Sequence, residues 1–206
     1  SWVNQLGDYV GETLSALLVI CYHLGLKWAD ISEKLQSLPQ EKGRSTFVKG
    51  LNNVTLLDDV YNANPNSMIN MLNTICQLDY KNYVGIVGNL AEMDEGLKES
   101  ASYIVENIPG KLTRLLLNGE TGKILTPLIQ KKHKTIKVDF YEDLSDMTKA
   151  ALKLCDENTI IGIKGSRSAH LERVLYVLQG ESITCNLERC GLLQMCFLCG
   201  QLKNKG

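Results

Sequence analysis

The chain has 206 residues, of which 44% are hydrophobic and 22% are charged, and its formal net charge is -1. Such a chain folds as a globular protein, with room for one good-sized domain or for a domain and part of another. The small net charge excludes a general attraction to nucleic acid or to an anionic membrane. The longest apolar stretch, residues 14–21, is too short to span a bilayer. We therefore expect no nucleic-acid partner and no membrane partner.

The start of the chain and its cysteines predict a compartment. No export leader precedes the first helix, and the chain begins at Ser1 without a Met. We therefore expect a cytoplasmic protein with reduced thiols, and a chain that is cut or incomplete at this end. Cys21, Cys76 and Cys155 occupy apolar positions of helical patterns, where we expect small buried hydrophobic residues.

The first 42 residues predict a helical hairpin. Six apolar residues recur every three or four positions and form one stripe of a helix that ends at Gly25: Leu6, Val10, Leu14, Leu17, Cys21 and Leu24. Trp28, Ile31 and Leu35 predict a second, shorter helix that stops before Pro39. Two helices are too few to bury this stripe, so we expect the pair to dock on another unit. The polar residues 40–44 then form a joint.

Beyond this joint, strand patterns alternate with helical patterns. Residues 47–48 and 54–57 predict a β-hairpin about residues 50–53. Further strands are predicted at 83–87, 112–117, 135–138 and 159–163, and helices after Pro65 and at 98–108, 122–131, 144–155 and 168–178. Repeated βα units with short connections predict an α/β fold, a mostly parallel sheet with helices on both faces. The pattern does not determine the order of the strands.

The most informative turn runs from Asp58 to Met68. Five Asp or Asn residues fall within nine positions, between a buried strand and a helix: Asp58, Asp59, Asn62, Asn64 and Asn66. Asn64 and Pro65 suit the N-cap and the first residue of that helix. Ordinary capping remains an alternative, but it needs only one such residue. We therefore expect a polar site at the carboxyl end of this strand.

A second turn, Lys164-Gly-Ser-Arg-Ser168, joins the last strand to the last helix. Ser166 can cap the helix, and Lys164 and Arg167 add two cations where backbone N–H groups point outward. Such a turn suits a phosphate or a carboxylate, although a capped, solvated turn is the alternative. The turn at Gly88-Asn89-Leu90-Ala91-Glu92 follows its strand in the same way and is a weaker signal.

Other motifs do not carry catalytic chemistry. Gly119-Glu-Thr-Gly-Lys123 imitates the end of a P-loop, but Ile124 stands where a magnesium-binding Ser or Thr is needed, so we expect a plain turn into a helix. His23, His133 and His170 form no Ser-His-Asp or Cys-His set, and we expect them at the surface or its boundary.

Four cysteines crowd the last 22 residues: Cys185, Cys190, Cys196 and Cys199. Cys196 and Cys199 have the two-residue gap of a zinc-binding pair, which leaves a zinc site open. The other pair has a four-residue gap, and no His is nearby in the sequence. We therefore expect residues 181–206 to be a poorly ordered, Cys-rich tail and expect no metal site.

The turns also carry a family resemblance. Asp59-Val-Tyr-Asn-Ala-Asn-Pro65 and Lys164-Gly-Ser-Arg-Ser168, with Glu172 beyond, resemble two turns of the C-terminal domain of MurF-type Mur ligases. Residues 88–93 resemble a third turn, usually Gly-Asp-Met-x-Glu-Leu, and Gly43-Arg44 matches the joint that opens the domain. The resemblance covers residues 5–180 in register. It implies three segments: 1–42 as the helical end of a central ATPase domain, 43–180 as a Rossmann-like ligase domain, and 181–206 as the tail.

The resemblance implies an ATP-dependent ligase of peptidoglycan synthesis. With ATP and Mg²⁺, such enzymes phosphorylate the carboxylate of a UDP-N-acetylmuramoyl-tripeptide, and the amine of D-alanyl-D-alanine attacks the acyl phosphate. In that scheme Arg44 and Asp59 contact the nucleotide, Asp59 through ribose hydroxyls. The residues implied for the dipeptide side are Asn62, Asn64, Lys164, Ser166 and Arg167. The P-loop and the magnesium ligands belong upstream of Ser1, so we expect no catalytic residue here and an inactive chain.

The chain also departs from the family. Residues 7–13 read Gly-Asp-Tyr-Val-Gly-Glu-Thr, where the family has Gly-x-His-Asn-x-x-Asn, and Asn89 replaces an Asp. These changes put adenine recognition in doubt and favour an alternative, a non-catalytic binding module or decayed paralogue. A folylpolyglutamate or cyanophycin synthetase type is a further alternative, against which Tyr61-Asn-Ala-Asn64 argues. No Gly-x-Gly-x-x-Gly follows a strand, which argues against a nicotinamide-binding domain.

Overall fold

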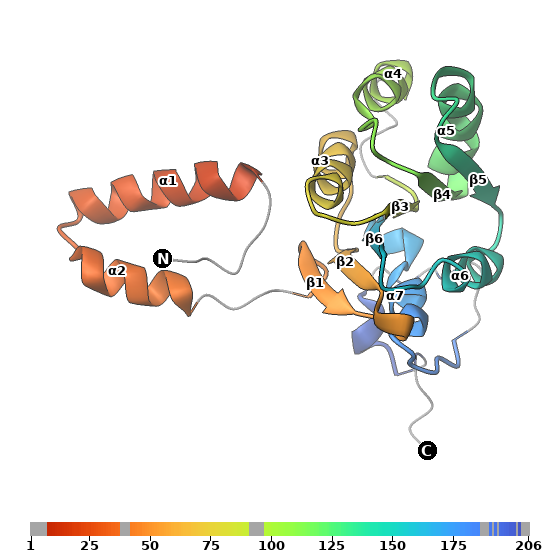
Figure 1. Cartoon of the computed structure of the whole chain (residues 1–206). Coiled ribbons are helices and arrows are strands. Elements are labelled where there is room, and N and C mark those ends of the chain that lie inside the picture. Colours follow the sequence, from red (N-terminus) through yellow and green to blue (C-terminus); the bar gives the residue numbers. More distant parts are fainter. Residues whose placement is uncertain are drawn as a thin grey trace.

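The computed structural model describes residues 8–37, 42–90, 97–185, 190, 192, 194–200 and 202. Within this part of the chain, one six-stranded sheet is covered by helices on both faces, which confirms the predicted α/β class (Figure 1). No helix in these ranges is both long and apolar enough to cross a bilayer.

The predicted helical hairpin is present as α1 (Asp8–His23) and α2 (Trp28–Gln36). Figure 1 shows the two helices side by side and apart from the sheet. Large apolar side chains on them face solvent, among them Ile20 at 55% exposure and Trp28 at 62%. The pair therefore leaves apolar surface uncovered, as expected of helices that dock on another unit. Leu6 of the predicted stripe lies outside the described residues.

The sheet has the strand order β1-β2-β6-β3-β4-β5. Its strands are β1 (Thr46–Lys49), β2 (Thr55–Asp59), β3 (Asn82–Val87), β4 (Arg114–Asn118), β5 (Lys137–Tyr141) and β6 (Thr159–Lys164). Only β1 is antiparallel, because the 3₁₀ turn η1 (Leu51–Asn53) joins it to β2 as the predicted hairpin. All other pairs are parallel, so β2, β6 and β3 end at the same edge.

Two apolar clusters hold the helices on the sheet. On one face lie α3 (Pro65–Cys76), α4 (Leu97–Asn107) and α5 (Gly119–Lys132), whose core includes Leu72, Ile104 and Leu125. On the other lie α6 (Leu144–Leu152) and α7 (Glu172–Leu178), with Met147 and Val174. A Cβ at Gly162 of β6 would clash with the Met71 sulfur, so this glycine lets α3 approach the sheet closely.

Several elements differ from their predicted bounds: β4 begins at Arg114 instead of residue 112, and α6 ends at Leu152 instead of residue 155. Strand β5 begins at Lys137 instead of residue 135, because Lys137 and Tyr141 pair with Arg114 and Asn118 of β4. The predicted last helix is split into the 3₁₀ turn η2 (Arg167–Ala169) and α7. His170 separates them in a left-handed conformation (φ 50°) and is 2% exposed, so the expectation that it lies at the surface is wrong.

Part of the tail packs on α7. The 3₁₀ turn η3 (Cys196–Leu198) contacts that helix, and Met195, Cys196 and Leu202 are buried. The backbone N–H of Thr184 donates to the carbonyl of Leu202 over 3.0 Å, which joins the two ends of this segment. Residues 186–189, 191, 193, 201 and 203–206 of the tail lie outside the described ranges.

Candidate functional site

A cavity of about 300 Å³ opens at the carboxyl edge of the sheet, beside the ends of β2 and β6. We call it the edge cavity. The two strands pair in parallel with Asp59 opposite Lys164, so the fold itself brings the two polar turns together. The lining is mostly polar: Arg44, Ser45, Asp59, Asn62, Asn64, Asn66, Ser67, Asn70, Met71, Thr74 and Lys164. Five of the seven predicted site residues lie there, and Ser166 and Arg167 do not.

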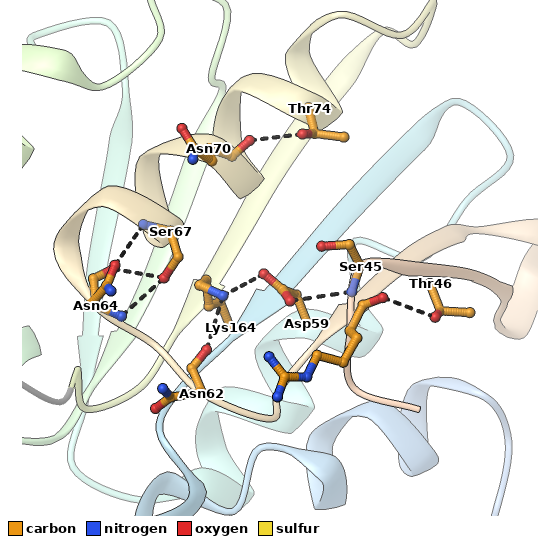
Figure 2. A network of polar contacts seen from close by, with 10 residues as sticks. Ser45, Thr46, Asp59, Asn62, Asn64, Ser67, Asn70, Thr74 and Lys164 are labelled. Carbon is orange, nitrogen blue, oxygen red and sulfur yellow. Dashed lines mark hydrogen bonds and ion pairs between the residues drawn. The ribbon is translucent and has the colours of Figure 1, made fainter. Parts of the chain in front are cut away.

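An ion pair forms the floor of this cavity. The Lys164 ammonium contacts the Asp59 carboxylate and donates to the Asn62 carbonyl over 3.0 Å (Figure 2). The two side chains are only 3% and 13% exposed. Burial lowers the pKa of Lys164 and raises the pKa of Asp59, while the attraction between the two groups opposes both shifts. A buried pair of this kind is costly to break, because the remaining charge has no counterpart.

The amide-rich turn supplies both the cap of a helix and side chains that line the edge cavity. Asn64 is the N-cap of α3: its side-chain oxygen accepts from Ser67 N over 2.8 Å, and the Ser67 hydroxyl accepts from Asn64 N over 3.0 Å (Figure 2). This reciprocal capping box is the role predicted for Asn64. Asn62 is exposed and has its backbone carbonyl on Lys164, so its side chain projects beside the buried pair.

The joint at Gly43-Arg44-Ser45 closes over the end of β2. Gly43 N donates to Asp58 Oδ2 over 2.9 Å, and Ser45 N donates to Asp59 Oδ1 over 3.2 Å. Gly43 has φ +77°, a conformation that favours glycine. Asp58 is 7% exposed, and burial raises its pKa to about 6 against the opposing effect of the Gly43 and Val60 amides. The acidic pair therefore anchors the joint as well as the cavity.

Tyr61 is a site residue that the sequence reasoning missed. The Arg44 guanidinium lies 4.0 Å from the centre of its ring and that of Arg167 lies 4.2 Å away. Arg167 also donates to the Tyr61 hydroxyl. The Tyr61 ring therefore contacts Arg44 from the joint and Arg167 from the second turn, beside the edge cavity. The position of Tyr61 between Asp59 and Asn62 was the feature of the sequence that could have predicted its place at the site.

The second and third turns brace each other. Ser166 N donates to the Asn89 carbonyl over 2.8 Å, and Asn89 Oδ1 accepts from Thr121 N over 3.3 Å. Ser166 is buried and shares a hydrogen bond with the Ser168 hydroxyl over 2.9 Å. It makes no side-chain cap, so the predicted capping role is wrong. Residues 91–93 of the third turn lie outside the described ranges.

The P-loop imitation is a plain turn, as predicted. Helix α5 begins at Gly119, and the Lys123 ammonium lies 3.3 Å from carboxylate oxygens of both Glu120 and Glu142. Its cation is therefore held by surface carboxylates of the chain itself.

The edge cavity can hold a polar, anionic ligand. Lys164 and Arg44 supply cations, Asn62 supplies an amide, and Asp59 offers carboxylate oxygens to hydroxyl groups. Its residues do not fit a divalent cation, because Asp59 is the one carboxylate among the described residues of the lining and is paired with Lys164. The arrangement therefore favours ligand binding over metal chemistry.

Comparison with known proteins gives consistent matches. Residues 43–167 match the family described as "Mur ligase, glutamate ligase domain". A UDP-N-acetylmuramoyl-tripeptide–D-alanyl-D-alanine ligase of Haemophilus influenzae is 27% identical over 87% of this chain and 39% of that protein. Its Escherichia coli namesake is 29% identical over 75% of the chain and 33% of that protein. The chain therefore spans little more than a third of these relatives.

The fold match is equally broad. The crystal structure of MurF from Acinetobacter baumannii superposes with a TM-score of 0.72 at 19% identity, covering 88% of this chain and 40% of that one. At this identity the likeness concerns the fold. The family match covers more than half of the chain, and this protein therefore belongs to the Mur ligase family.

Proposed function

We propose that this chain is the C-terminal part of a MurF-type ligase, an ATP-dependent enzyme that joins D-alanyl-D-alanine to a UDP-N-acetylmuramoyl-tripeptide in peptidoglycan synthesis. The edge cavity carries the proposal, because the amide turn and Lys164 meet in it. The relatives named for this reaction match most of the chain in sequence. Residues 1–42 are then the end of the preceding ATPase domain, and 43–180 are the ligase domain.

Each site residue has a proposed part in binding. Asp59 accepts from Ser45 N and from Lys164, which leaves further lone pairs on its two oxygens for ribose hydroxyls. Arg44 lies over Tyr61 beside it and faces the nucleotide phosphates. Asn62 and Lys164 bind the dipeptide, and the Lys164 ammonium contacts the carboxylate of the dipeptide. Asn64, Ser166 and Arg167 shape that side of the site, the last through Tyr61.

ATP and Mg²⁺ serve the full-length enzyme in this proposal. The polar lining beside Arg44 and Asp59 fits a nucleotide, whereas the edge cavity does not fit the metal. The whole protein acts in the cytoplasm, where its nucleotide substrates are made available. The 206 residues contain no P-loop, so the isolated chain binds ligands without turning them over.

Titration calorimetry with D-alanyl-D-alanine tests the binding role. We expect weak, saturable binding that is lost in Asn62→Ala and absent with L-alanyl-L-alanine. Asn107→Ala is the matched control, because Asn107 lies at the end of α4 and its side-chain amide donates to the Tyr103 carbonyl of the same helix. Equal heats for Asn62→Ala and the unaltered chain would remove the dipeptide from this cavity.

A phosphate-release assay tests the predicted inactivity. The chain is mixed with ATP, Mg²⁺, the tripeptide nucleotide and D-alanyl-D-alanine, and we expect no phosphate above background. Turnover by this chain alone would show that a catalytic apparatus is contained in it.

One observation favours a second function, a non-catalytic module or decayed paralogue. Residues 8–13 of α1 lack the His and both amides that the family places there. Titration with ADP and with the dipeptide separates the two functions. Binding of both supports a ligase domain, and binding of neither supports decay.

A further inference from the structure

A second polar cluster lies away from the edge cavity, where the tail meets the start of α7. His170 and the four tail cysteines line one small cavity of about 10 Å³, which we call the cysteine cavity: His170, Cys185, Cys190, Cys196 and Cys199. This volume holds about one water molecule or one ion. His170 precedes α7, whereas the four cysteines follow it in the tail, so sequence spacing alone does not reveal the set.

The geometry at its centre suits metal coordination. Cys196 Sγ lies 3.3 Å from His170 Nδ1, and a Glu172 carboxylate oxygen lies within 4.8 Å of both residues' ligand atoms. Two ligand atoms on a tetrahedral zinc ion are about 3.5 Å apart, given bond lengths of about 2.0 Å to nitrogen and about 2.3 Å to sulfur. The Cys196–His170 pair therefore already has close to the separation that a shared ion requires.

Buried polar atoms at this place lack partners. His170 Nε2 and Glu172 Oε2 are buried without a hydrogen bond in the part of the chain that the structure describes, and both residues are 2% exposed. A buried polar atom without a partner destabilises the fold, because it has lost its hydrogen bonds to water. Glu172 Oε1 accepts from Cys196 N over 3.2 Å, which fixes the Cys196 backbone beside His170. A cation at this point would offset the cost of burying these groups.

The backbone conformation at His170 also supports a ligand role for its side chain. Its left-handed conformation, φ 50° and ψ 38°, is uncommon for a residue other than glycine and costs free energy. That conformation ends η2 and turns the imidazole to the tail rather than to solvent. A role as an inward ligand accounts for it, whereas the helix connection by itself does not require a histidine.

Other uses of these cysteines fit less well. All seven cysteines are free thiols, so no disulfide explains the cluster. A small hydrophobic role accounts for Cys76 and Cys155 inside the two cores, but not for thiols grouped around an imidazole and a carboxylate. Arg173 Nη1 donates to Cys185 Sγ over 3.9 Å, so this thiol of the cavity lining is held in place by a residue of α7.

We propose that one zinc ion binds at the cysteine cavity, held by the three mutually close ligand atoms of His170, Glu172 and Cys196, with one further thiolate of the cavity lining as the fourth ligand. Thiolate, imidazole and carboxylate groups are all zinc ligands, and four protein ligands on one ion make a structural zinc site. The ion ties the tail to α7 and braces His170, three residues after Arg167. This proposal does not depend on the ligase function.

Metal analysis of the full chain tests the proposal. The chain is purified in reductant without chelator or polyhistidine tag, and zinc is measured by plasma mass spectrometry. We expect one zinc per chain and, after exchange with Co²⁺, the intense visible bands of tetrahedral cobalt with thiolate-to-metal charge transfer. A zinc content near zero after incubation with zinc, or a cobalt spectrum without thiolate bands, overturns the proposal.

Variants locate the ion. Cys196→Ser and His170→Gln each lower zinc affinity by more than about 100-fold, because they remove a direct ligand rather than an outer partner. Cys21→Ser, on α1, is the matched control and retains the ion. If Cys196→Ser fails to fold, His170→Gln and the cobalt spectrum of the unaltered chain still decide. Retention of zinc by both ligand variants, or its loss in Cys21→Ser, places the ion elsewhere.

Discussion

The edge cavity and the cysteine cavity both contain clustered polar side chains, but the two clusters differ in whether these side chains have partners within the protein. In the edge cavity Lys164 pairs with Asp59. Beside it, the guanidinium groups of Arg44 and Arg167 both lie over the Tyr61 ring. In the cysteine cavity a ring nitrogen and a carboxylate oxygen are buried without a partner in the described chain. We therefore expect the first site to bind its ligand reversibly, and we propose that the second holds an ion as part of the fold.

Breaking the internal pair should have the largest effect. Lys164→Met leaves Asp59 buried without its counter-charge, and we expect the free energy of unfolding to fall by about 3–5 kcal/mol. Urea denaturation measures this loss. The double variant Asp59→Asn/Lys164→Met should recover most of it, because neither charge remains. Equal stability of the single and double variants would mean that the pair is not coupled.

Removing the carboxylate beneath the joint should change the pH dependence of stability. Burial raises the folded-state pKa of Asp58 from 3.8 to about 6, so the folded chain holds this proton more tightly than the unfolded chain does. The stabilisation is full below about pH 4 and is lost as the pH rises through about 6. Asp58→Asn should abolish this slope and be up to about 3 kcal/mol more stable at pH 7.

Denaturation from pH 4 to pH 7 checks this expectation. The Asn side-chain oxygen can still accept from Gly43 N, so the joint is retained. Parallel stability curves for the two chains would show that Asp58 does not titrate in this range.

Removing zinc should affect the tail region by a smaller amount. An ion present at about 100 times its dissociation constant stabilises the folded state by about 2.7 kcal/mol. Thermal unfolding with and without a chelator measures this difference. It should vanish in His170→Gln, and an equal chelator effect in that variant would contradict a cysteine-cavity origin.

The smallest expected effect separates capping from ligand contact at Asn64. Asn64→Ala removes the cap of α3 and should cost about 1 kcal/mol, whereas Asn64→Ser keeps a capping oxygen and most of the stability. If Asn64 also contacts the dipeptide, Asn64→Ser binds it more weakly at nearly unchanged stability. Unchanged affinity in Asn64→Ser would restrict Asn64 to capping.

Local patterns predicted most of the fold and of the edge cavity. The buried strand before Asp58, Pro65 as the first residue of α3, and the alternation of strands and helices are visible in short windows of sequence. Parallel strands end at the same edge, so the fold class predicted Asp59 and Lys164 at one edge of the sheet. Their direct contact depends on β2 and β6 being neighbours, and the sequence did not reveal that strand order.

Long-range contacts explain what the sequence did not reveal. Ser166 gives up its predicted cap because its N–H reaches Asn89 on the neighbouring turn and its hydroxyl pairs with Ser168. Tyr61 joins two arginines that are far apart in sequence. His170 seemed remote from the cysteines, yet it touches Cys196 because η3 folds back on α7. Residue types and spacing do not encode such tertiary contacts.

The edge cavity is proposed here to bind the dipeptide. Titration of the ¹⁵N-labelled full chain with D-alanyl-D-alanine, followed by NMR, tests this binding most directly. We predict saturable shifts of the backbone amides at Asn62, Asn64 and Lys164, with the amides of α6 unmoved. Shifts confined to other parts of the chain, or none at millimolar dipeptide, would contradict the claim.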